Sequence, residues 1–220
     1  MKLTIVAATG AIGRLLLEQA VDDGHEVTAV VRNPAKLTRP VPAVTADLRT
    51  ADPADLEPAL VGADAVLSGL GPQSTSDTGI ASRGTRTLVT AMAAADVRRI
   101  VVVSAAPVGT VATPGHPHPP RHDPGDGVFM RYVASPLIGR LLRKVYVDLA
   151  TMEEILRDSG LEWTAVRPPR LTNRPLRAYR TAYGRNIRGG AFASRADVAD
   201  YMLRALDLPE SIGQTVGIAS

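Results

Sequence analysis

The sequence predicts a doubly wound α/β fold, in which helices cover both faces of a parallel sheet. Three observations predict it: short β-branched apolar runs recur along the chain, segments with helical periodicity separate them, and a glycine-rich turn follows the first run. Strands that are apolar on both faces and alternate with helices are typical of parallel sheets. The length of 220 residues suits one core, so we expect residues 1–220 to form a single domain.

The apolar runs are four or five residues long and rich in Val, Ile, Leu and Ala, so each predicts a strand. They are Leu3–Ala7, Val27–Val31, Ala43–Ala46, Ala65–Ser68, Ile100–Ser104, Trp163–Arg167 and Gln214–Ile218. Between them, apolar residues recur at the spacing of one helix face. We expect helices over residues 12–23, 88–95 and 149–158, with stops at Gly24 and at Ser159-Gly160, and a helix start that is N-capped by Ser194.

The segment from Pro107 to Gly127 departs from this pattern, because it is dense in Pro, Gly and His. We expect a long loop without regular structure, followed by an amphipathic helix over Phe129–Val145. The loop leaves the fifth strand at its C-terminal end, where open α/β sheets bind ligands, so it is expected to border the site. His116, His118 and His122 lie in it without Cys nearby, and a solvent-exposed loop is favoured over a metal site.

Composition narrows the class of protein. Apolar residues make up 45% and charged residues 21% of the chain, which is the balance of a globular protein. The net charge is only +3 and the basic residues are spread out, so we expect no nucleic-acid partner. No apolar run approaches the roughly 20 residues that span a bilayer, and no membrane association is expected. The absence of Cys suits a reducing compartment, so we expect a cytoplasmic protein.

The turn after the first strand has the residues of a phosphate-binding loop. In Ala8-Thr9-Gly10-Ala11-Ile12-Gly13, Gly10 lets the backbone approach a pyrophosphate and Gly13 lets the helix pack close to the strand. The helix N-terminus then offers free N–H groups to the anion. Ala7 replaces the first glycine of the usual form, and we expect its φ to stay negative. Together these features predict a Rossmann-type dinucleotide site.

Arg32 follows the second strand, and Lys36 comes one turn later. NAD-selective folds place Asp or Glu here for the ribose 2′-hydroxyl, whereas an Arg suits a 2′-phosphate. A guanidinium can bind a phosphate dianion through two hydrogen bonds. The cofactor is therefore predicted to be NADP(H).

With these residues in place, the chain resembles an atypical short-chain dehydrogenase/reductase of the NAD(P)H-binding, NmrA-like group, and in particular the flavin reductase and biliverdin-IXβ reductase proteins. The resemblance spans almost the whole chain. Beyond the loop and Arg32, it is carried by Ala46-Asp47-Leu48, Leu70-Gly71, Val103-Ser104-Ala105, Met152–Leu161, Arg167-Pro168-Pro169 and Ser194–Ala199.

The resemblance implies roles for several of these residues. Asp47 and Leu48 are expected to face the adenine, and Gly69, Leu70 and Gly71 the ribose and pyrophosphate. Ser104, with Ala105 beside it, is expected to face the nicotinamide as the candidate catalytic residue, and Pro168 and Pro169 are expected to border that pocket. A polar residue that ends a buried strand at the ligand edge is expected to hydrogen-bond a ligand, although a satisfied strand end is the alternative.

The catalytic pair of many short-chain dehydrogenases is missing. They use Tyr-x-x-x-Lys as acid and base, but no Tyr in this chain has Lys four residues later. Nicotinamide supplies hydride itself, so such a protein need only bind an acceptor whose product takes its proton from solvent. Planar conjugated acceptors such as flavins, quinones and tetrapyrroles meet that condition.

The sequence leaves three functions open. The first is an NADPH-dependent reductase that acts on a small planar conjugated substrate. The second is a non-catalytic NADP(H)-binding redox sensor of the NmrA type. The third is a sugar epimerase or dehydratase, which the missing Tyr-Lys pair disfavours. The short C-terminal part also disfavours it: we expect this part to form only a small segment on the substrate side of the sheet. Whether the protein is a monomer or a dimer is left open.

Overall fold

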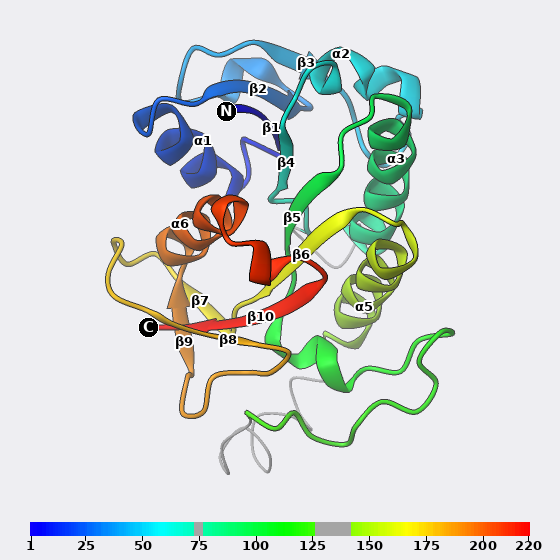
Figure 1. Cartoon of the computed structure of the whole chain (residues 1–220), viewed down its shortest axis with the longest axis vertical. Coiled ribbons are helices and arrows are strands. Elements are labelled where there is room, and N and C mark those ends of the chain that lie inside the picture. Colours follow the sequence, from blue (N-terminus) through cyan, green and yellow to red (C-terminus); the bar gives the residue numbers. More distant parts are fainter. Residues whose placement is uncertain (73–76, 126–141) are drawn as a thin grey trace.

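The computed structural model describes residues 1–72, 77–125 and 142–220, and its main sheet has eight strands. Their order is β3-β2-β1-β4-β5-β6-β10-β8, and all neighbours are parallel except β10 and β8. This confirms the predicted doubly wound α/β fold (Figure 1). The strands are β1 (Lys2–Val6), β2 (Glu26–Val31), β3 (Ala43–Thr45), β4 (Ala65–Ser68), β5 (Arg99–Val103), β6 (Glu162–Arg167), β8 (Arg180–Tyr183) and β10 (Gln214–Ala219).

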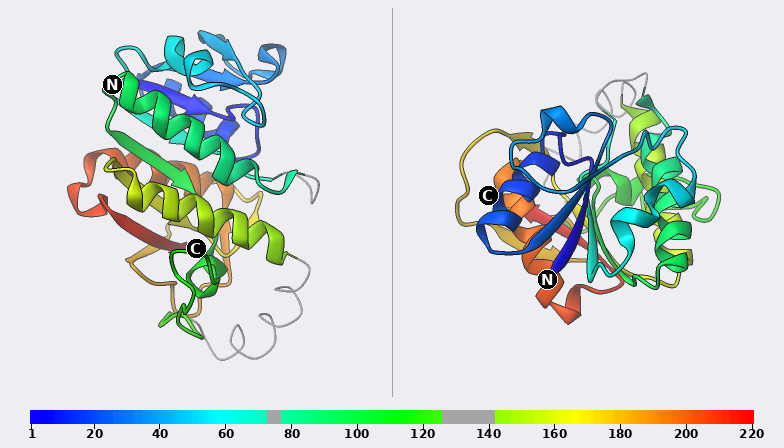
Figure 2. Two further views of the ribbon diagram at one scale, coloured as in Figure 1. Left: turned by 90° about the vertical axis from the view of Figure 1, so that its right-hand side faces the viewer. Right: turned by 90° about the horizontal axis from the view of Figure 1, so that it is seen from above.

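Two pairs of helices cover the two faces of the sheet (Figure 2). The helices α1 (Gly13–Asp22) and α6 (Arg195–Arg204) pack together on one face, and α3 (Ile80–Ala94) and α5 (Arg143–Asp158) on the other. Each face has its own aliphatic core. Leu16, Val198 and Met202 belong to the first, whereas Leu88 and Met152 belong to the second. The short elements are η1 (Pro34–Lys36), η2 (Pro53–Leu56), α2 (Glu57–Leu60), η6 (Ala205–Asp207) and η7 (Pro209–Ser211).

The seven predicted strands lie within one residue of their predicted bounds, and the predicted helix ends are confirmed. Gly24 follows α1 with φ +80°, and Gly160 follows α5 with φ +71°, the left-handed conformation that favours glycine. Ser194 caps α6: its Oγ accepts from Asp197 N at 2.9 Å, while Asp197 Oδ2 accepts from Ser194 N at 3.0 Å. This is a reciprocal capping box.

Three short strands between β6 and α6 were not predicted. β7 (Arg170–Thr172) and β9 (Phe192–Ser194) form a separate two-stranded parallel sheet, and β8 extends the main sheet antiparallel to β10. β7 and β8 are half-exposed or exposed at every position, and β9 has only three residues, of which Ala193 and Ser194 are buried. None of the three strands therefore leaves a clear apolar run in the sequence. This part corresponds to the small C-terminal segment that we expected beside the substrate.

The expectation for Pro107–Gly127 is wrong at its start, because Ala106–Thr110 forms a 3₁₀ helix, η4. Such a helix tolerates a proline in its first turn, where no N–H is required. The loop is tied to α5 by a hydrogen bond from Thr113 Oγ1 to Glu154, and Asp123 Oδ1 accepts from Asn186 N at 2.8 Å.

Residues 129–141 of the predicted helix Phe129–Val145 lie outside the described residues, and only its last four residues are described. Val145, its last residue, lies in the first turn of α5, in one helix with Leu149 and Met152. Among the described residues, no helix is both long enough and apolar enough to cross a membrane.

Candidate functional site

A cavity of about 510 Å³ runs along the carboxyl edge of the main sheet. One end lies where β2 and β3 finish, and the other lies beyond β5, where α5, β7 and the first residue of α6 border it. The cavity therefore passes the ends of β1 and β4, where the strand order reverses and where doubly wound folds bind ligands. The predicted site residues that line it are Thr9, Gly10, Ala11, Ile12, Arg32, Asp47, Leu48, Gly69, Leu70, Gly71 and Ser104.

The loop after β1 is closely packed around its glycines. A Cβ on Gly13 would lie 2.1 Å from the carbonyl oxygen of Ala7, and one on Gly69 would lie 2.9 Å from the backbone nitrogen of Gly13. A side chain at Gly10 would come within 3.1 Å of the same Ala7 oxygen. The first turn of α1 can therefore approach the ends of β1 and β4 only because these positions lack a Cβ.

Ala7 corrects one expectation. Its φ is +58°, not negative, so a residue with a Cβ occupies the left-handed position that the usual motif gives to glycine. This conformation costs a non-glycine residue roughly 1–2 kcal/mol. Hydrogen bonds hold it in place: Ala7 N donates to Val30 O at 2.9 Å, and Ala7 O accepts from Gly10 N at 2.8 Å. The loop keeps the glycine-type geometry at the expense of local strain.

The N-terminus of α1 is open to an anion. Its N-cap residue, Ile12, provides no side-chain hydrogen bond, and the first turn holds no acidic residue. Among the described residues, no side chain offsets the partial positive charge of this helix end, and Gly10, Ala11 and Ile12 line the cavity beside it. This arrangement suits a phosphate group.

Charged side chains gather where β2 and β3 end. Arg32 is exposed and lines the cavity, and the turn after it is fixed by Asn33, whose Oδ1 accepts from Ala35 N at 3.0 Å. Asp47 pairs with Arg49 at 2.8 Å, and the hydrogen bond from Arg49 lowers the pKa of Asp47, with a smaller contribution from Arg32. Arg49 also lies 3.6 Å from Asp77. Arg49 thus partly neutralises the acidic side chains at this end, while Arg32 forms no salt bridge among the described residues.

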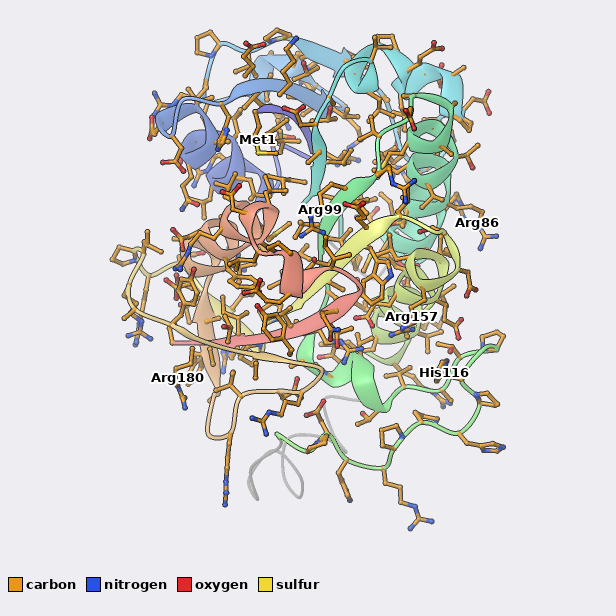
Figure 3. All side chains as sticks on the ribbon, in the orientation of Figure 1. Met1, Arg86, Arg99, His116, Arg157 and Arg180 are labelled. Atoms are coloured by element: carbon orange, nitrogen blue, oxygen red, sulfur yellow. The ribbon has the colours of Figure 1, made fainter. Side chains whose placement is uncertain are left out.

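Ser104 lies at the other end, directly after β5, and is part of a buried polar cluster. Its hydroxyl donates to Glu153 Oε1 at 2.7 Å, and Glu153 is completely buried in α5. Arg167, at the end of β6, donates to the same carboxylate from Nε at 2.9 Å and from Nη2 at 2.5 Å. Arg157, labelled in Figure 3, adds a further bond to Oε2 at 2.8 Å. Sequence reasoning assigned no role in the site to these three partners.

A signal for Glu153 was present in the sequence. Leu149 and Leu156 lie four residues before and three residues after it, so an acidic side chain falls on the apolar face of a helix. A buried carboxylate needs charged or hydrogen-bonding partners. The sequence could therefore have pointed to a buried partner, although not to Ser104 in particular.

The remaining predicted site residues do not line the cavity. Ala8 and Gly13 are buried beneath the loop, and Lys36 is exposed on η1. Pro168 is buried, and its carbonyl oxygen accepts from Ala106 N at 2.9 Å, which holds together the segments that follow β5 and β6. Ala8, Gly13 and Ala105 are adjacent in sequence to lining residues, whereas Lys36 and Pro169 are not.

The cavity also has lining residues that were not predicted. Most are apolar, and those beyond β5 come from α5 and from the unpredicted strand β7. They are Ala7, Val30, Val31, Ala46, Pro72, Asp77, Ile80, Val103, Val145, Leu149, Leu171 and Arg195.

Within the described ranges, no group of three or more His, Cys, Asp or Glu side chains could hold a metal ion. His116 lies on the loop below α5 (Figure 3).

A family model described as NAD(P)H-binding matches residues 7–209, which includes the glycine loop, the end of β2 and the Ser104 cluster.

Solved structures with this fold cover the whole chain. The oxidoreductase ylbE from Lactococcus lactis is 21% identical, with a TM-score of 0.79 and 91% of its own chain covered. A short-chain dehydrogenase/reductase from Veillonella parvula in complex with NADP is 18% identical, with a TM-score of 0.77 and 94% covered. A Streptococcus pneumoniae protein with the provisional name NADH-flavin reductase is 24% identical, with a TM-score of 0.73 and 99% covered. At these sequence identities, the similarity shows the fold alone.

Proposed function

The chain belongs to the NAD(P)H-binding family, and from that premise we propose that it is an NADPH-dependent reductase that passes hydride to a planar conjugated acceptor such as a flavin, a quinone or a tetrapyrrole. The observation that carries the proposal is the open N-terminus of α1, which packs closely against the ends of β1 and β4 at two glycines. Gly13 and Gly69 leave no room for a Cβ, and no side chain in residues 1–72, 77–125 and 142–220 caps the helix end. These residues fit the pyrophosphate of a dinucleotide.

The preference for NADPH over NADH rests on Arg32. Its guanidinium lines the cavity at the end of β2, where the 2′-substituent of the adenosine ribose is bound in this fold. The sequence has Arg32 at the position where NAD-selective folds have an acidic residue. The similar Veillonella protein is a complex with NADP, which supports the same choice.

When bound, the reduced nicotinamide supplies the hydride, and the chain provides position and surroundings. The far end of the cavity is lined by Val103, Val145, Leu149 and Leu171, a surface suited to a flat apolar ring system. The described lining residues include no Tyr, His, Lys or Glu, and the two acidic ones, Asp47 and Asp77, lie beside Arg49 at the other end of the cavity. Tyr146, in α5, packs against the core, and burial raises its pKa. The acceptor would therefore take its proton from solvent.

The reductase proposal is tested by following NADPH absorbance with FMN, a quinone and a biliverdin in parallel. We expect oxidation above the protein-free background with at least one acceptor. Tight NADPH binding with no oxidation by any of them would reject the reductase and favour the non-catalytic redox sensor.

The cofactor preference is tested by replacing Arg32. Arg32→Ala should lower the affinity for NADP⁺ about tenfold to a hundredfold and leave the affinity for NAD⁺ nearly unchanged, because it removes a charge-assisted hydrogen bond worth about 1.5–3 kcal/mol. Arg39→Ala is the matched control: Arg39 pairs with Asp22 and does not line the cavity. Equal affinity of the unaltered protein for NADP⁺ and NAD⁺ would refute the preference.

A further inference from the structure

The hydroxyl of Ser104 has a fixed direction. Glu153 Oε1 accepts from Ser104 Oγ and from Arg167 Nε, and Glu153 Oε2 accepts from Arg167 Nη2 and Arg157 Nη2. A guanidinium nitrogen can only donate, so Glu153 acts towards both arginines as an acceptor. Its remaining partner, Ser104, must then donate its proton to the carboxylate.

The consequence concerns what Ser104 can offer to a ligand. Ser104 lines the cavity, but its single proton is directed away from the cavity towards Glu153. A hydroxyl has one donor and two acceptor positions, so only oxygen lone pairs remain for a group in the cavity. A carbonyl oxygen or a developing oxyanion at this point would meet another oxygen acceptor. A ligand N–H would be well matched.

The cluster is held by three separate elements. Ser104 follows β5, Glu153 lies in α5, and Arg167 ends β6. The carboxylate is completely buried and the Arg167 side chain is only 8% exposed. A buried charge is tolerated when its hydrogen bonds are satisfied, and the four bonds to Glu153 meet that condition. The hydroxyl therefore has little freedom to turn when a ligand arrives.

We propose that Glu153 is a positioning residue that makes Ser104 an acceptor, and that Ser104 thereby recognises the carboxamide N–H of the nicotinamide. This inference rests on the proposed function, because it requires a nicotinamide cofactor in the cavity. It gives Ser104 a role in placing the hydride donor, distinct from polarising an acceptor oxygen.

The test compares the equilibrium binding of NADP⁺ with that of its 3-acetylpyridine analogue, in which a methyl group replaces the amide nitrogen. The unaltered protein should bind NADP⁺ about tenfold more tightly, since the analogue lacks one hydrogen-bond donor. In Ser104→Ala the two ligands should bind equally. Ser82→Ala is the matched control, because Ser82 also donates to a buried carboxylate, Asp148 Oδ1, but does not line the cavity. It should keep the tenfold difference.

Glu153→Gln tests the positioning role. The glutamine oxygen would take the place of Oε2, where it can still accept from Arg167 Nη2 and Arg157 Nη2. Its amide nitrogen would take the place of Oε1, lose the bond from Arg167 Nε, donate to Ser104 and turn the hydroxyl proton towards the cavity. The tenfold difference should then fall below about threefold. A merely structural role would lower the melting temperature and weaken both ligands by the same factor, leaving the difference intact.

The outcomes separate this inference from the proposed function. Retention of the tenfold difference in Ser104→Ala, even if Glu153→Gln does not fold, overturns the inference and leaves the cofactor assignment in place. Equal binding of the two ligands by the unaltered protein also overturns it. Failure of NADP⁺ to bind the unaltered protein overturns both.

Discussion

The helices α1 and α3 both begin at the carboxyl edge of the sheet beside the same cavity. They differ in how the N–H groups of their first turns are capped. Ile12 caps α1 without a side-chain hydrogen bond, and the turn is free of acidic residues. The first turn of α3 is held by Asp148 from α5, whose carboxylate accepts from Ala81 N and Ser82 N at 3.0 Å each and from Ser82 Oγ at 2.5 Å.

The two ends carry the same partial positive charge, because both have unpaired backbone N–H groups. In α3 the chain supplies the negative group from 67 residues away, whereas in α1 the part of the chain that the structure describes supplies none. A helix end can bind a phosphate only if its own chain has left it open. Of the two ends, α1 is therefore the one that favours a phosphate in the proposed site, although α3 also borders the cavity through Ile80.

Closing the space under α1 should have the largest effect. In Gly13→Ala the new Cβ would lie 2.1 Å from Ala7 O, so the loop must move. We expect the free energy of unfolding to fall by about 2–3 kcal/mol and NADP⁺ affinity to fall by about a hundredfold. Thermal melting and ligand titration measure the two effects. Gly71→Ala, where no atom lies within 4 Å, should leave the melting temperature unchanged. A Gly13→Ala protein that binds NADP⁺ normally would contradict the assignment to α1.

Removing the carboxylate of Asp148, which caps α3, should lower the stability of the protein without changing its affinity for NADP⁺. Asp148→Ala leaves the buried N–H of Ala81 without its partner, so we expect a loss of about 2 kcal/mol, or roughly 4–8 °C in melting temperature. Ser82→Ala, which loses only the hydroxyl bond, should cost about 0.5–1 kcal/mol. NADP⁺ affinity should stay within about twofold in both. A tenfold change in affinity would show that α3 also takes part in binding.

Adding a carboxylate to α1 should have the smallest effect on stability, and in the opposite direction. Ala11 is exposed and lines the cavity next to the helix end. Ala11→Asp should raise the free energy of unfolding by about 0.3–1 kcal/mol through the helix dipole, and weaken NADP⁺ binding about tenfold by repulsion. High salt should reduce both effects. The control is Ala11→Asn, because asparagine has nearly the size of aspartate but no charge, and it should change neither the stability nor the affinity for NADP⁺. If Ala11→Asn weakened NADP⁺ binding as much as Ala11→Asp, steric hindrance would be the cause.

Of the two helix ends, only that of α1 could be predicted from the sequence. The open end of α1 was predictable, because Gly10 and Gly13 stand beside it in the chain. Asp148 could not be paired with α3 from the sequence, since its partners lie 66 and 67 residues earlier and nothing local marks it.

The same limit applies elsewhere. The main strands were predictable because each is a continuous apolar run, whereas β7, β8 and β9 are held by pairing partners that sequence periodicity does not record. Ser104 was predicted as a residue that hydrogen-bonds a ligand, but its bond to Glu153, which decides whether it donates or accepts, joins residues 49 positions apart. Ala7 shows a further limit: its φ of +58° is imposed by hydrogen bonds on both sides rather than by its own preference.

The Asp148 cap also has a consequence for the order of assembly. During synthesis, α3 leaves the ribosome well before Asp148 has been added to the chain, so its first turn emerges with N–H groups that only water can satisfy. The helix cannot gain its final end until α5 has formed and docked beside it. Completion of the cavity wall at Ile80 is thus delayed until the chain has been made past residue 148, and a nascent chain halted before that point would carry the glycine loop without a finished pocket around it.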